Sequence, residues 1–471
     1  MALAVRWVQD RREHRLLAQK YDSLGVCWRL AGPDPTRVPG SVASAAFGRH
    51  WVRDAACITR PLFEEMEVAS RLSSNEAGEI ERAVLRYVLF AKELQSLKPP
   101  RDVYDKRQAH MSYARYIGER HTVGEASFGT GGIYYEPHDR YGFVQLDAPA
   151  LRSLFLLRHG LAMSSRGESY APWSELWKVI FADLHYLCHN WRQPCFDVWG
   201  EVQGVHYFTL QCIRQVLREA AKVDIHWEEG FTPAWLAHWD ETASEVEAEL
   251  RLFVINGSLW PTRAPSTAEP RPRRPDASAL LAHVWLQGGS VPVFEELPLG
   301  RLVDDLRREL GGGPLIGRYP DDGYSKNKPW LLTSLALAGC EYLCGRRPAG
   351  DLVLETAAET REWLEPGDSQ EKGWTHATYL AALKLREGAP APPLPPAPPP
   401  APLPCPHVCP CVPPPIVLPP TIAETAADQT AGHSGSDVPP SPESAPAGSA
   451  ANEAPAAAPV QAVEIPSAIR P

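Results

Sequence analysis

The chain has 471 residues, a length typical of two or three domains, or of one large domain with an appendage. Its formal net charge of −10 argues against a nucleic-acid or membrane-surface binder, because such proteins usually present an excess of basic residues. Hydrophobic residues make up 44% of the chain, which is enough to bury a sizeable core.

The proline content is high and unevenly distributed. Of the 48 prolines, many lie between residue 388 and the C-terminus, where the chain is mostly Pro and Ala with almost no aromatic residue. Such a segment cannot bury enough apolar surface to offset the entropy lost on ordering. We therefore predict a folded body over residues 1–387 and a disordered Pro/Ala-rich tail over 388–471.

Helical periodicity recurs along the body. The first long patterns begin at Ser73 and at Pro172, a favoured first-turn residue. Comparable patterns predict helices over 206–222, 233–254, 277–286, 299–310, 329–344 and 374–387. No series of alternating runs indicates a sheet, and the Pro/Arg-rich segment 261–276 fits a surface loop better than a domain linker. The expected fold class is all-α with long loops, where sites usually lie.

The sequence gives no sign of membrane insertion, export or a bound metal. No stretch approaches the ~20 apolar residues of a membrane helix, and the N-terminus becomes charged before a signal core can form. An intracellular location is the default expectation. The ten cysteines contain no Cys-x-x-Cys pair, and we interpret the Cys/His run over 405–411 as accidental tail composition. We therefore predict neither a metal nor a cofactor.

Four loops, over 47–54, 141–152, 196–202 and 317–324, combine aromatic rings with Arg and carboxylates. Aromatic faces stack on sugar rings, and Arg and carboxylate groups bind several hydroxyls at once. Any one loop could instead hold an Arg–Asp pair that ties it to core aromatics. The four together favour a neutral polyol as ligand.

The order of these motifs resembles glycoside hydrolase family 15, the glucoamylases, over roughly residues 20–387. The resemblance is carried by Trp51-Val-Arg-Asp54, by Gln145-Leu-Asp147-Ala-Pro-Ala-Leu-Arg152, by the run from Phe196 to Thr209, by the run from Gly317 to Trp330, and by Gly373-Trp-Thr-His376. It implies an (α/α)6 barrel, a six-hairpin toroid, whose loops form a pocket. It also implies release of glucose from the non-reducing ends of α-1,4-glucans with inversion. The expected partner is an α-glucan or malto-oligosaccharide, and we expect a monomeric body.

The resemblance implies six substrate-binding residues, namely Arg53, Asp54, Tyr141, Trp199, Arg318 and Trp330. The first two grip the terminal glucose at the bottom of the pocket, and Arg318 binds a further hydroxyl. Tyr141 stands where the family usually has a stacking Trp. The two tryptophans are expected to form pocket walls.

The family's general acid is the Glu that follows the loop Trp, and here that position is Gly200. The neighbouring Glu201 matches a second family Glu that normally holds substrate. Adjacent side chains on an extended segment point to opposite sides, although the backbone freedom of glycine could re-aim Glu201. Asp197 matches a carboxylate position proposed as catalytic in relatives.

The general base is expected in the connection between Cys344 and Trp374, which is shorter than in relatives. The best candidate is Glu365, with Glu371 and Glu362 behind it. Because an inverting glycosidase needs two carboxyl groups, loss of the acid lowers the rate by about 10²–10⁴. Two hypotheses follow: a glucoamylase-type exo-α-glucosidase of reduced activity, or an inactive glucan-binding pseudoenzyme.

Overall fold

The structure is a computed structural model that describes most of the body. In the N-terminal segment it describes residues 13, 16, 19, 20, 23, 24 and 27. It further describes residues 43–44, 49–67, 74–97, 123–129, 144–165, 173–223, 232–263, 275–286, 297–311, 313–325, 328–360 and 371–389. The chain divides into two units at residue 395, and the second unit lies wholly outside the described residues. The predicted tail, apart from Gly388 and Ala389, therefore also lies outside them.

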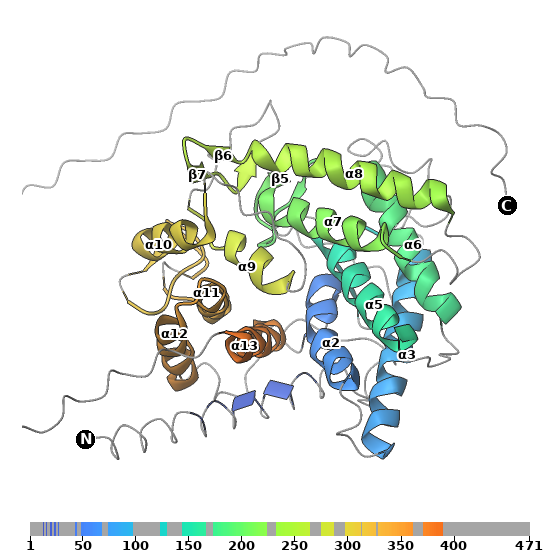
Figure 1. The fold of residues 1–471 in the computed structure, drawn as a ribbon, viewed down its shortest axis with the longest axis horizontal. Coiled ribbons are helices and arrows are strands. Elements are labelled where there is room, and N and C mark those ends of the chain that lie inside the picture. The colour runs from blue at the N-terminus through green and yellow to red at the C-terminus, as the bar shows by residue number, and fades with distance from the viewer. Residues whose placement is uncertain are drawn as a thin grey trace, which may run out of the picture. The chain divides into compact units, whose positions relative to one another are not determined.

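Six helices form a closed ring. In chain order they are α2 (Val52–Glu67), α5 (Asp147–Ser165), α7 (Tyr207–Ala220), α9 (Ser278–Trp285), α11 (Leu331–Leu343) and α13 (Glu371–Gly388). Each contacts the next, and α13 returns to α2 (Figure 1). Five further helices pack outside this ring: α3 (Ser74–Ser96), α6 (Trp173–Asn190), α8 (Pro233–Arg251), α10 (Leu299–Leu310) and α12 (Arg347–Glu359).

An outer helix follows each of the first five inner helices and brings the chain back, so the inner helices run in one direction. The first turns of α2, α5 and α13 accordingly meet at one end, where Arg53 bonds to Asp147 and lies over Trp374. At the other end, Lys384 of α13 pairs with Glu64 of α2. We call the first end the N-terminal end of the ring and the second its C-terminal end.

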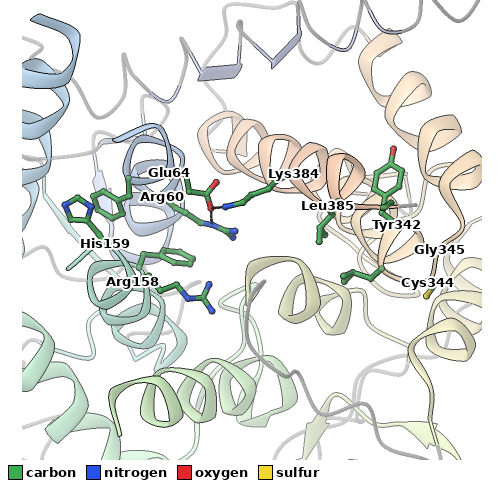
Figure 2. A pocket seen from close by; sticks show the side chains of 14 residues that line it. Arg60, Glu64, Arg158, His159, Tyr342, Cys344, Gly345, Lys384 and Leu385 are labelled. Atoms are coloured by element: carbon green, nitrogen blue, oxygen red, sulfur yellow. Dashed lines mark hydrogen bonds and ion pairs between the residues drawn. The ribbon is translucent and has the colours of Figure 1, made fainter. Parts of the chain in front are cut away.

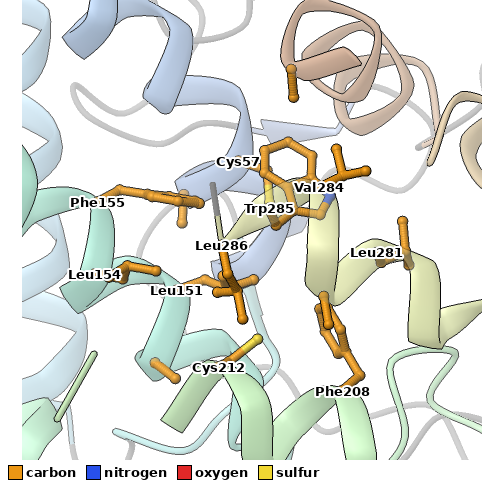
Figure 3. Packing of buried hydrophobic residues seen from close by; sticks show 14 of the residues in the cluster. Cys57, Leu151, Leu154, Phe155, Phe208, Cys212, Leu281, Val284, Trp285 and Leu286 are labelled. Carbon is orange, nitrogen blue, oxygen red and sulfur yellow. The ribbon is translucent and has the colours of Figure 1, made fainter. Parts of the chain in front are cut away.

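Apolar side chains from the six inner helices fill the centre of the ring. Phe155 of α5 and Trp285 of α9 have ring centroids 6.0 Å apart, and both are buried (Figure 3). Cys57, Cys212 and Phe208 belong to the same buried cluster. Because α5 and α9 are buried around almost their whole circumference, these helices form the inside of a packed barrel.

The strands are short and belong to loops. They are β1 (Ala43–Ser44), β2 (Arg49–Trp51), β3 (Ser127–Gly129), β4 (Cys195–Phe196), β5 (Gln203–His206), β6 (Val254–Ile255), β7 (Ser258–Leu259) and β8 (Thr262–Arg263). The antiparallel sheets have the orders β1-β2-β3, β4-β5-β8 and β6-β7. Two of them bear on the site, because β2 leads into α2 and β5 leads into α7. The all-α expectation is confirmed, with these ribbons as a local addition.

No helix in the described ranges has both the length and the apolar character needed to cross a membrane.

Candidate active site

The first group of site residues surrounds Arg53 in the first turn of α2. Its Nη1 donates to Oε1 of Gln145 over 2.5 Å and to Oδ2 of Asp147 over 2.9 Å, which joins α2 to the start of α5. Its guanidinium lies 4.8 Å from the ring centroid of Trp374 in α13. The sequence motif around Arg53 was expected to be a loop, but the structure places it where β2 passes into helix α2.

Asp54 lies beside this arginine, with Oδ1 3.6 Å from Nε of Arg53. Burial raises its pKa to about 6, against the opposing charge of Arg53, and the nearby Asp147 adds to the rise. Among the described residues, Oδ1 of Asp54, Nε2 of Gln145 and Oδ1 of Asp147 have no hydrogen-bond partner. Buried polar atoms of this kind are typical of sites that a ligand or water completes.

The loop between β4 and β5 carries Gly200 and Glu201. Gly200 has a φ of +72°, in the left-handed region that favours glycine, and its N–H donates to the backbone carbonyl of Asp197 over 2.8 Å. The side chain of Asp197 closes the same turn, because Oδ1 accepts from the backbone N–H groups of Glu201 at 2.7 Å and Val202 at 3.1 Å. Asp197 is buried and holds the loop that presents Glu201.

Glu201 lies between two donors from the segment before α11. Nη1 of Arg318 donates to Oε1 over 3.0 Å, and the hydroxyl of Tyr319 donates to Oε2. Arg318 is fixed in turn by Asp322, which accepts from its Nε at 2.6 Å and from its Nη2. The carboxylate of Glu201 thus accepts on both oxygens, and one-fifth of its side chain remains exposed.

Aromatic rings surround Arg318. Its guanidinium lies 4.3 Å from the ring centroid of Trp330, 5.0 Å from that of Tyr324 and 5.3 Å from that of Trp199. Trp199 and Trp330 stack with centroids 5.6 Å apart, as do Tyr324 and Trp330. The result is an arginine held against a layer of stacked rings, an arrangement suited to a ligand with hydroxyl edges and apolar faces.

Asp276 is a site residue that sequence reasoning missed. It lies just before α9, and its carboxylate accepts from Nε1 of Trp199 at 3.1 and 3.2 Å and from the backbone N–H of Ser278 at 2.7 Å. Burial raises its pKa to about 6, and the charge of Asp197 contributes. The available signal was an Asp two residues before a helix, since Asp side chains often bond to the backbone N–H two residues further on.

Asp147, from the Arg53 group, and Asp197, from the Gly200 loop, both affect the pKa values of Cys195 and His206. Burial raises the pKa of Cys195 to about 12, and the charges of both Asp147 and Asp197 add to that rise. The same two carboxylates act on His206, whose pKa burial lowers. His206 is fixed by the backbone carbonyl of Cys195 and the hydroxyl of Thr262, so its role is to join strands.

Two predicted site residues, Tyr141 and Glu365, lie outside the described residues. The structure brings Trp199, Glu201, Arg318 and Trp330 together, and separately joins Arg53 and Asp54 to Gln145, Asp147 and Trp374. No group of three or more His, Cys, Asp or Glu side chains in the described ranges could hold a metal ion.

The family model of Glycosyl hydrolases family 15 matches residues 40–284, more than half of the chain. The chain belongs to this family. The match includes the Arg53 group, apart from Trp374, and the Gly200 loop with Asp276. The (α/α)6 barrel of family 15 is therefore the fold of the ring described above.

Curated relatives in this family are named glucoamylases. The chain is 23% identical over 317 residues to a probable glucoamylase of Schizosaccharomyces pombe, covering 64% of this chain and 62% of the relative. It is 28% identical over 326 residues to glucoamylase 1 of Rhizopus oryzae, covering 64% of this chain and 49% of the relative. The chain therefore spans about three-fifths or less of the length of these family 15 relatives.

Solved family 15 structures show the same fold. The glucoamylase from Saccharomycopsis fibuligera superposes with a TM-score of 0.64 at 19% identity, over 80% of this chain and 96% of that chain. The family 15 glucoamylase from Hypocrea jecorina gives 0.58 at 19% identity, over 81% of this chain and 73% of that chain.

Proposed function

We propose that this protein binds the non-reducing end of an α-glucan at the N-terminal end of the ring and hydrolyses the terminal glucosidic bond slowly, as a glucoamylase-type enzyme. The observation that carries the proposal is the pair of polar groups around Arg53 and Arg318, in a chain of family 15. The relatives named above are glucoamylases, and they suggest the reaction class.

The binding role rests on the chemistry of these groups. Asp54 and Arg53 present a carboxylate and a guanidinium side by side, which can accept from and donate to vicinal hydroxyls of one sugar ring. Arg318 offers further donors among stacked rings, and Trp199 and Trp330 offer apolar faces to the sugar. Tyr141 is proposed to stack on substrate from outside the described residues.

The slow rate follows from the position of the general acid. Gly200 replaces the family Glu there, so the neighbouring carboxyl, Glu201, is the remaining proton source on this loop. Both carboxylate oxygens of Glu201 accept hydrogen bonds, one from Arg318 and one from Tyr319, which directs them to these residues and not to a leaving oxygen. Asp197 keeps this loop in place, and Glu365 is proposed as the base that activates water for inversion.

A second candidate function, glucan binding without turnover, is favoured by the same loop. If Glu201 acts only as a substrate-holding carboxylate, the protein retains its sugar contacts and lacks an acid. The two functions differ in one measurable respect, which is whether a substrate that needs little proton assistance is hydrolysed.

The test compares maltose with α-glucosyl fluoride, whose leaving group needs little proton assistance. For the slow enzyme we expect hydrolysis of the fluoride to exceed that of maltose by about 10²–10⁴, with β-glucose as the first product. If neither substrate is hydrolysed while maltotriose still binds, the binding function replaces the enzyme. If maltotriose does not bind, and Arg53→Ala changes neither binding nor hydrolysis, both functions are rejected.

A further inference from the structure

A cavity of about 880 Å³ opens at the C-terminal end of the ring, away from the candidate active site. Its walls come from four inner helices, α2, α5, α11 and α13 (Figure 2). On α13, Trp374 of the first group and Lys384 of the cavity are ten positions apart, about 15 Å along the helix axis. The cavity is therefore a separate site, of the size that small-molecule sites usually have.

Two cations on one side of the cavity share a single carboxylate. Nε of Arg60 donates to Oε1 of Glu64 over 2.8 Å, and Nζ of Lys384 donates to the same oxygen over 3.0 Å (Figure 2). Burial favours the neutral form of Glu64, but Arg60 and Lys384 together lower its pKa below the ordinary value. This wall therefore carries two positive charges against one negative charge.

Arg158 brings a third cation from α5. Its Nε and Nη2 bind Glu219 of α7 at 2.6–3.2 Å, which fixes the guanidinium at the rim of the cavity. Its side chain is 23% exposed, and Figure 2 shows the guanidinium directed toward the space below Arg60. Three cations on three helices, α2, α5 and α13, thus line a cavity that contains one carboxylate among its lining residues.

The rest of the lining suits a polyol ring. Phe63 and His159 stack with centroids 4.7 Å apart, and Phe155 adds another aromatic ring. Leu343 at the end of α11, Gly345 just after it and Gly388 at the end of α13 also line the cavity.

We propose that this cavity binds a phosphorylated sugar. The phosphate lies among Arg60, Arg158 and Lys384, which match an anion with charge-assisted hydrogen bonds. The sugar ring packs on the aromatic side, and its hydroxyls donate to Glu64. Neither the family membership nor the proposed hydrolysis requires such a site.

The test measures binding of glucose 6-phosphate, glucose and inorganic phosphate to the full chain by isothermal titration calorimetry. We expect glucose 6-phosphate to bind more tightly than either of the others, because only it uses both parts of the cavity. Lys384→Gln and Arg158→Gln are each expected to weaken its binding about tenfold or more, through loss of a charge-assisted hydrogen bond.

Lys178→Gln is the matched control. Lys178 on α6 is 52% exposed and pairs with Glu175, just as Lys384 is 52% exposed and pairs with Glu64. Affinity for glucose 6-phosphate should be unchanged in this variant and in Asp54→Asn, which alters only the N-terminal end. The proposal is overturned if glucose 6-phosphate does not bind, if inorganic phosphate binds as tightly, or if Asp54→Asn abolishes binding while Lys384→Gln and Arg158→Gln retain it.

Discussion

Arg318 and Glu201 are 117 positions apart in the sequence, and yet Nη1 of Arg318 donates to Oε1 of Glu201 over 3.0 Å. The contact ties the loop before α7 to the segment before α11. It also occupies the carboxylate that follows Gly200 in the chain. One ion pair therefore links the shape of the proposed sugar site to the chemistry it can perform.

Replacing Arg318 with Gln should weaken glucan binding. The variant loses the charge that Glu201 and Asp322 share, together with the cation held against Trp199 and Trp330. We expect the Kd for maltotriose to rise about 10- to 100-fold, the effect of one or two charge-assisted hydrogen bonds. Intrinsic tryptophan fluorescence measures this, because two tryptophans lie at the contact.

Arg308→Gln is the control for this change. Arg308 is 66% exposed and pairs with Asp305 on the surface of α10, so its loss should leave the Kd for maltotriose unchanged. Equal affinity of the Arg318 and Arg308 variants would show that Arg318 does not contact the ligand.

Gly200→Glu should raise maltose hydrolysis, because the proposed function places the missing general acid at this position. The gain is limited by the backbone, because a φ of +72° costs an L-residue about 1–2 kcal/mol. We expect the maltose rate to rise by up to about 10²–10⁴ and the rate on α-glucosyl fluoride to change much less. Initial rates of glucose release from the two substrates provide the measurement.

Gly200→Ala separates the effect of the new carboxyl group from the effect of backbone strain at residue 200. It adds a Cβ with the same φ penalty and no acid, so it should lower stability without raising the maltose rate. If Gly200→Glu behaves like Gly200→Ala, the base or the loop geometry is also unsuitable for hydrolysis.

Several of the helices that the sequence predicted have one polar face. The patterns at 233–254 and 299–310 correspond to α8 and α10 within one turn, because each of these outer helices exposes a charged side. By contrast, α5 was interpreted as a loop over 141–152. Its buried residues extend around the helix and include Asp147 and Arg152, so no apolar stripe marks it.

The sequence predicted only part of the candidate site. Motifs predicted Arg53, Asp54, Arg318 and Glu201 as site residues, and the structure places Arg53 beside Asp54 and Arg318 beside Glu201. Pairings between distant segments were not visible: Gln145 and Asp147 on Arg53, or Asp276 on Trp199, depend on closure of the ring. Asp197 illustrates the limit, because its residue type suggested chemistry while its contacts are those of a turn.

Asp276 should make stability depend on pH. Its pKa is about 6 in the folded protein, against the ordinary value of 3.8. Below pH ~4 both states hold the proton. Between pH ~4 and ~6 only the folded state keeps it, so the free energy of unfolding falls as pH rises, by on the order of 3 kcal/mol in total, and then levels off.

Asp276→Asn tests this, because the amide keeps an acceptor for Ser278 and does not titrate. In urea unfolding at pH 4, 5, 6 and 7, the free energy of unfolding should fall less with rising pH for the variant than for the wild type. Asp54 also has a raised pKa and contributes equally to both profiles, so the difference isolates Asp276. Parallel profiles would mean that Asp276 is not protonated in this range.

Asp183 should be essential for the stability of the barrel. Its carboxylate accepts from Nε and Nη2 of Arg152 at 2.9 and 2.6 Å, from Gln95 at 2.7 Å and from Ser153 at 2.9 Å, which joins α3, α5 and α6. Asp183→Ala leaves Arg152 buried without its counter-charge. We expect a loss of about 3–5 kcal/mol in the free energy of unfolding, measured in urea.

Two further variants test whether the buried charge of Arg152 causes this loss of stability. One alters an exposed ion pair, and the other removes both buried charges. Glu245→Ala removes the partner of Arg192, where the side chains are 45% and 60% exposed, and should cost less than ~1 kcal/mol. Arg152→Met combined with Asp183→Leu removes both buried charges and should cost less than Asp183→Ala alone, because no uncompensated guanidinium remains. If the double variant is the less stable of the two, the contribution of Asp183 comes from its bonds to Gln95 and Ser153 and not from pairing with Arg152.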